Sequence, residues 1–112
     1  MAIGIIHFFP GGTRKQYDTV LAIVHPSRTQ LPQGQLFHAA GASADGFTIV
    51  AVHDSKESWE AFRDNVLRPR IAAGISGGFT TEPQETIFEI ENLQAGSAST
   101  AASPSEEREQ AR

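Results

Sequence analysis

Hydrophobic and polar positions in the first part of the chain change from a strand-like to a helical pattern. Residues 3–9 form a β-rich run that stops at Pro10 and the two glycines after it, which predicts a strand. Thr13 can then cap a helix, and Pro26 limits its other end. The apolar positions of this helix repeat at i, i+3, i+4 and i+7, and they are Tyr17, Val20, Leu21 and Val24. We therefore expect a strand followed by a helix.

The middle of the chain has the pattern of a hairpin followed by a second helix. Residues 35–41 and 47–53 flank a turn-like segment, so we expect two antiparallel strands. The next helix can be capped by Asp54 or Ser55, and it should end or kink at Pro69. Its apolar face consists of Trp59, Phe62 and Val66.

The last predicted strand follows a glycine-rich loop at 74–78. It covers about residues 86–93, where apolar side chains alternate with glutamates. Beyond it, residues 94–112 contain no Leu, Ile, Val, Phe, Trp or Tyr. Such a segment cannot bury enough apolar surface to offset the entropy of ordering it. We expect one domain over 1–93 and a disordered tail over 94–112.

The order of the elements, βαββαβ, predicts a ferredoxin-like α+β fold. Two right-handed crossovers place both helices on the same face of a four-stranded antiparallel sheet, in the spatial order 4-1-3-2. The other face has no cover, although alternation makes it apolar. The side chains expected on it are Ile6, Phe8, Val50 and Val52. A second copy stacked face to face would bury them, so we expect a homodimer through this sheet face.

Charge and composition remove several classes of function. The net charge is −4 and the basic residues do not cluster, which argues against binding to nucleic acid or to an anionic membrane. The chain has no cysteine, and this excludes disulfides, thiolate nucleophiles and iron–sulfur clusters. It has no positively charged leader and no apolar stretch approaching the roughly 20 residues that span a bilayer. We expect a cytoplasmic protein.

Three segments of the chain resemble one known group of proteins. They are FPGGTRKQY at 9–17, GQLFHAAG at 34–41 and VAVHDSKESWEAF at 50–62. Together they are similar to the dimeric α+β-barrel superfamily, in particular to its antibiotic-biosynthesis monooxygenase-type domains. The resemblance covers about residues 3–93 and implies a ferredoxin-like domain that forms a dimeric α+β barrel. The superfamily includes cofactor-free oxygenases, polyketide cyclases, lactone isomerases and haem-degrading enzymes.

Two of these activities do not carry over to this sequence. The haem-handling members bind iron through a histidine on the second helix, whereas residues 55–73 contain no histidine here. The plant-type polyketide cyclases have a catalytic histidine on the third strand, at a position that we place at Phe47. The resemblance therefore favours neither haem chemistry nor that cyclase mechanism.

The resemblance also implies a ligand cleft between the sheet and its two helices. Alternation puts two histidines on this side of the sheet, and a neutral imidazole can move protons near neutral pH. The catalytic candidates are His7, His53 and Tyr17. The residues expected to bind the substrate are Ile5, Phe37, Ile49, Trp59 and Phe62. An apolar pocket with a few polar groups is typical of small-molecule sites.

The remaining histidines have simpler interpretations. We expect His38 to face the partner sheet, and His25 to end the first helix at the negative end of its dipole. A metal site is a more specific alternative interpretation of the histidines, in which His25, His53 and Gln35 lie at one end of the sheet. No HxH or HxxxH spacing occurs in the sequence, and metal sites need three or four ligands at fixed geometry. We therefore expect no metal.

These observations lead to two hypotheses. The first is a small enzyme that acts on an apolar aromatic or polyketide-like molecule, without a cofactor, by oxygenation or by His-mediated proton transfer. The second is a non-catalytic ligand-binding or structural homodimer in which the same histidines only form core hydrogen bonds. His7 separates the two, because a polar ring in the middle of an apolar strand needs either a hydrogen-bond partner or a function.

Overall fold

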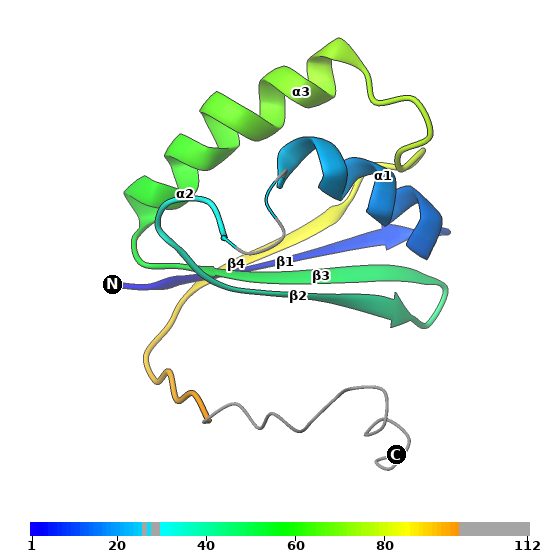
Figure 1. The fold of residues 1–112 in the computed structure, drawn as a ribbon. Coiled ribbons are helices and arrows are strands. Elements are labelled where there is room, and N and C mark those ends of the chain that lie inside the picture. The colour runs from blue at the N-terminus through cyan, green and yellow to red at the C-terminus, as the bar shows by residue number, and fades with distance from the viewer. Residues whose placement is uncertain (26, 28–29, 97–112) are drawn as a thin grey trace.

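A four-stranded antiparallel sheet carries all the helices on one of its faces (Figure 1). The computed structural model describes residues 1–25, 27 and 30–96. The strand order β2-β3-β1-β4 confirms the predicted order and the ferredoxin-like α+β fold class. The elements are β1 (Ile3–Pro10), α1 (Arg14–Val24), β2 (Gln35–Ser43), β3 (Gly46–His53), α2 (Lys56–Phe62), the π-helical segment η1 (Arg63–Leu67), α3 (Arg68–Ala73) and β4 (Gln84–Glu89).

Helix α1 begins where the sequence predicts. The Thr13 hydroxyl accepts a hydrogen bond from the Gln16 amide at 3.1 Å, and the Gln16 side chain accepts one from the Thr13 amide at 3.0 Å. This reciprocal capping box satisfies two backbone donors that the helix itself leaves free. It fixes the start of α1, and with it the position of Tyr17 above the sheet.

The second helix does not end at Pro69, which was one of the two outcomes expected there, but its regular α-helical form is interrupted just before that residue. It continues from α2 through η1 into α3 and ends at Gly74, whose φ is 89° (Figure 1). A proline ring collides with the carbonyl four residues earlier in a regular α-helix and offers no N–H to it. In η1 the Arg68 amide bonds instead to the Arg63 carbonyl five residues back, so the wider turn accommodates the proline.

A β-bulge in β2 changes which side chains point toward the helices. Gln35 pairs with His53, but Phe37, two residues later, pairs with Val52, so the register shifts by one residue. Since a shift of one residue moves all later side chains to the opposite face, His38 lies opposite Ala51 on the helix-covered face. The expectations that Phe37 faces the cleft and that His38 faces a partner sheet are both wrong.

The core lies between the sheet and the second helix. It is formed by Ile3 and Ile5 of β1 and by Trp59 and Phe62 of α2, with Val66 and Leu67 packed beside them. Strand β4 begins two residues earlier than predicted and is shorter. Within the described residues no helix is both long enough and apolar enough to cross a membrane. The predicted disordered tail lies outside the described residues from 97 onward.

Candidate functional site

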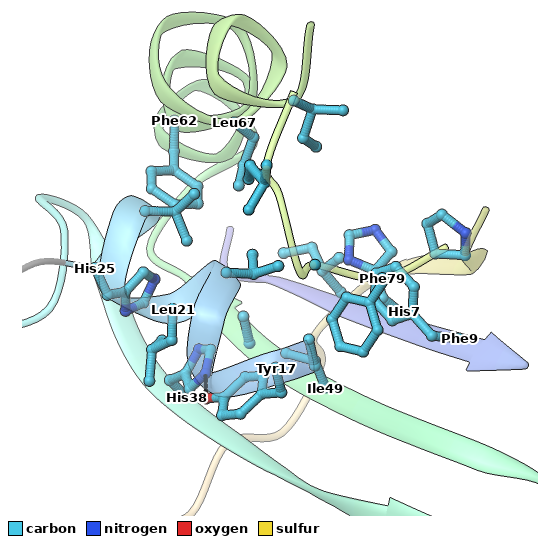
Figure 2. A pocket seen from close by; sticks show the side chains of 18 of the residues that line it. His7, Phe9, Tyr17, Leu21, His25, His38, Ile49, Phe62, Leu67 and Phe79 are labelled. Carbon is cyan, nitrogen blue, oxygen red and sulfur yellow. Dashed lines mark hydrogen bonds between the residues drawn. The ribbon is translucent and has the colours of Figure 1, made fainter. Parts of the chain in front are cut away.

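A cavity of about 470 Å³ lies between the helix-covered face of the sheet, the helices and the loop that precedes β4 (Figure 2). This volume is within the range of small-molecule sites. Six of the residues predicted for the site line it: Ile5, His7, Tyr17, Ile49, Trp59 and Phe62. Two do not, since Phe37 is on the opposite face and His53 is fully buried behind the lining.

His7 projects from the middle of β1 and is held by a carboxylate. Its Nε2 lies 2.8 Å from Glu85 Oε2, and β4 places Glu85 directly opposite His7 in the sheet. A carboxylate only accepts hydrogen bonds, so neutral His7 donates through Nε2–H and keeps the lone pair of Nδ1. The ring also lies 6.0 Å from Trp59. This arrangement orients a proton acceptor at the wall of the cavity.

Tyr17 and His38 form a second polar pair in the cavity wall. The Tyr17 hydroxyl is 2.6 Å from His38 Nε2, and the two rings are stacked at 6.0 Å. Figure 2 shows this pair on the side of the cavity away from His7. The His25 ring lies 4.8 Å from that of His38. His38 Nδ1 is buried and no described residue offers it a hydrogen bond.

Burial keeps this second cluster uncharged at neutral pH. It lowers the pKa of His38, and it lowers the pKa of His25 to about 4 with smaller contributions from His38 and His53. Burial also raises the pKa of Tyr17, as does Asp18, against an opposing effect of Arg14. His25 caps the C-terminal end of α1, as expected, but burial lowers its pKa, so the helix dipole does not keep it charged.

His53 has a structural environment rather than an open one. Its ring is fully buried, with Nε2 at 3.1 Å from Gln35 Nε2 and Nδ1 at 3.1 Å from Ser58 Oγ. Ser58 Oγ donates to the Ser55 carbonyl, so His53 donates to Ser58 through Nδ1–H and accepts from Gln35. Burial lowers its pKa, and Asp54 opposes this effect. Both ring nitrogens are thus occupied and out of reach of a ligand.

The loop before β4 closes one side of the cavity. Phe79 stacks on Phe9 with ring centroids 3.8 Å apart and an angle of 10° between the rings. The Thr81 hydroxyl donates to the Pro10 carbonyl at 2.8 Å. Gly78 is packed so closely that a Cβ there would lie 3.0 Å from Val20. The loop therefore belongs to the wall of the site, which its glycine-rich sequence did not indicate.

The predicted metal alternative is not supported by the arrangement of donors. Gln35 lies opposite His53, as this alternative expected, but the Gln35 side chain bonds to His53 Nε2 and occupies that nitrogen. In the described part of the chain no three His, Cys, Asp or Glu side chains are grouped so that they could hold a metal ion. We do not propose a metal site.

Comparison with known proteins defines the class of fold. No family model matches the sequence, and no curated protein matches it. Among solved structures, a Chloroflexus aurantiacus protein proposed to be an antibiotic biosynthesis monooxygenase is 16% identical and has a TM-score of 0.60, over 85% of this chain and 98% of that one. The fold is thus that of the antibiotic biosynthesis monooxygenase-type ferredoxin-like proteins, as the sequence resemblance implied.

Two Streptomyces proteins share this fold. SnoaB of Streptomyces nogalater, a cofactor-independent oxygenase, is 12% identical with a TM-score of 0.57, over 82% of this chain and 94% of that one. The monooxygenase from the gene ActVA-Orf6 of Streptomyces coelicolor, solved with nanaomycin D, is 17% identical with a TM-score of 0.53, over 86% of this chain and 92% of that one. At such identities the similarity concerns the fold.

Proposed function

We propose that this chain is a small enzyme that oxygenates an apolar aromatic or polyketide-like molecule without a cofactor. The observation that carries the proposal is His7, which lines a largely apolar cavity and is paired with the Glu85 carboxylate. A carboxylate that fixes the tautomer of an imidazole leaves its other nitrogen as a general base. The shared fold of SnoaB and of the ActVA-Orf6 monooxygenase agrees with this class of chemistry but does not by itself assign it.

The proposed reaction uses dioxygen as the oxidant and a phenol as the substrate. Loss of the hydroxyl proton gives a phenolate, which reduces dioxygen and forms a carbon–oxygen bond at a ring carbon. The peroxide formed takes up one proton and becomes a hydroperoxide. A base then removes the hydrogen from that carbon as a proton, the C–H electron pair forms the second carbonyl, and the O–O bond breaks so that hydroxide leaves. The hydroxide takes up a second proton, so the two protons lost by the substrate are returned and phenol and dioxygen yield quinone and water. We assign the removal of the ring-carbon proton to His7 Nδ1.

A ligand screen tests whether the cavity accepts such molecules. We expect hydroxylated naphthalenes and anthracenes to raise the thermal midpoint, because a ligand that binds only the folded state stabilises it by mass action. Flavin, haem and divalent metals in the same screen serve as cofactor controls and should not raise it. Compounds that bind are then incubated in air while oxygen consumption is measured. Binding without oxygen uptake would favour the proton-transfer or non-catalytic alternatives.

We also propose that the open face of the sheet pairs with a second copy of the chain. This face carries the predicted residues Ile6, Phe8, Val50 and Val52. The bulge in β2 adds Phe37 to it, and β4 adds Phe88, and their exposures are 49% and 46%. Gly4 leaves room for the Phe88 ring, since a Cβ there would lie 2.4 Å from it. An apolar face of this kind is typical of a dimer interface.

Light scattering tests the dimer. The protein should have twice the chain mass at micromolar concentration, whereas Val50→Glu should have the monomer mass, because it places an unpaired carboxylate in the interface. The matched control is Ala61→Glu, which adds the same charge at an exposed position of α2 and should remain dimeric. A monomeric wild-type protein would contradict the proposal.

A further inference from the structure

The cavity contains a second polar pair that the proposed role of His7 leaves unexplained. Tyr17 comes from α1 and His38 from β2, and they meet at 2.6 Å in the cavity wall. We propose that Tyr17 and His38 form a proton relay that accepts the proton of a phenolic or enolic hydroxyl of the bound molecule. The inference rests on the proposed function, because it supplies the first proton transfer of that reaction.

The relay requires one of the two directions that the Tyr17–His38 hydrogen bond can take. Tyr17 keeps its proton because burial raises its pKa, and in the relay its O–H donates to His38 Nε2. The proton of neutral His38 is then on Nδ1, which is buried without a partner among the described residues. A buried polar group without a partner destabilises the folded state, and groups of this kind need an explanation. A role in which His38 Nε2 receives a proton explains why the N–H of His38 lies at the unpaired Nδ1.

The transfer is balanced in atoms and charge. The ligand hydroxyl donates to the Tyr17 oxygen, whose own hydrogen already points to His38. As the ligand O–H bond breaks, a new O–H bond forms at Tyr17, and the original Tyr17 proton moves to His38 Nε2. The products are a ligand phenolate or enolate, neutral Tyr17 and an imidazolium on His38. A hydrogen-bonded chain of this kind also strengthens Tyr17 as an acceptor before transfer.

The groups around His38 favour a neutral resting state. Tyr17 and His25 lie against it from α1 and its C-terminal cap, and His53 of β3 acts on His25. Asp18 and Arg14, farther along α1, act with opposite sign on Tyr17. Burial lowers the pKa of His38, and no carboxylate of the described residues opposes that effect. The negative charge that stabilises the imidazolium is therefore the phenolate itself, which forms at the moment of transfer.

The position of the relay defines the class of ligand. Figure 2 shows Tyr17 and His38 on one side of the cavity and His7 on the other. A ligand whose hydroxyl reaches Tyr17 presents a different ring atom to His7. This arrangement suits a planar aromatic in which the hydroxyl and the reacting carbon lie at opposite ends, as in para oxidation of a phenol to a quinone.

The relay is tested with a coloured phenol whose ionisation can be seen on the protein. The probe is 5-hydroxy-1,4-naphthoquinone, which changes colour when its hydroxyl ionises. Bound to wild type, it should ionise at a pH lower by roughly one unit or more than when bound to His38→Gln. Glutamine can still accept from Tyr17, but it cannot hold the proton. Tyr17→Phe breaks the relay at its other member and should give the same shift.

The outcomes separate the relay from the proposed function. Lys15→Gln, at an exposed position of α1, serves as the control, and it should leave the ionisation of the bound probe unchanged. If the probe binds and neither His38→Gln nor Tyr17→Phe alters its ionisation, the relay is wrong and the proposed function stands. If the probe and related phenols do not bind to wild type at all, both fail. Thermal melts of each variant establish that every protein in the comparison is folded under the conditions of the titration.

Discussion

Replacing His7 with Gln is expected to lower turnover by roughly 10²-fold or more while the fold and the proposed dimer survive. Glutamine can donate to Glu85 as the imidazole does, so the contact at 2.8 Å in the wild type can be preserved. It has no lone pair of comparable basicity, so the proton on the reacting carbon has no acceptor. The measurement is oxygen consumption with a phenol that the ligand screen identifies, together with the thermal midpoint of the variant.

Glu85→Gln provides the companion variant. A neutral amide at this position can accept from His7 Nε2–H but no longer stabilises the imidazolium that forms when His7 takes a proton. Turnover should fall, though less than in His7→Gln, and its pH profile should move. If His7 has only a structural role, the thermal midpoint of His7→Gln falls and its turnover is unchanged. That result would remove His7 from the mechanism.

The fold could be predicted from the sequence because its signals are local and repeated. The capping box at Thr13, the helical stripe that starts at Tyr17 and the hairpin before His53 each depend on neighbouring residues. Together they admit few topologies. Pro69 signalled an irregularity but not its form, because the sequence rule assumes a regular α-helix and a π-helical segment removes the collision on which the rule depends.

The candidate site was predicted less completely, for reasons of register. If side chains alternate regularly from Gln35 onward, Phe37 points into the cavity and His38 points away from it. The bulge between Gln35 and Phe37 shifts the register by one residue, so the two side chains exchange faces. No residue type in this stretch predicts a bulge. Glu85 could have been found, because antiparallel pairing of the last strand with the first puts a carboxylate opposite His7. Phe79 could not, because it lies in a loop whose path the sequence pattern does not define.

Acid should destabilise this protein well above the pH at which carboxylates titrate. The cause is His25, whose pKa falls from 6.5 in the unfolded chain to about 4 in the folded one. Between these values the unfolded chain binds a proton that the folded chain does not, so stability is present above about pH 6.5 and is lost as the pH falls toward 4. The loss amounts to about 2 kcal/mol at pH 5 and about 3 kcal/mol when complete.

The pKa values of His38 and His53 are also lowered by burial, so their contributions have the same sign and add to the loss. Urea unfolding at pH 7 and pH 5 measures the total. His25→Gln should reduce the difference between the two pH values by about 2 kcal/mol, because the variant lacks the group whose proton affinity changes most. Lys15→Gln, at an exposed position of α1, is the control and should keep the full difference. Equal pH dependence in wild type and His25→Gln would show that His25 is solvated, and that the cluster around His38 is not the dry environment in which the relay is proposed to work.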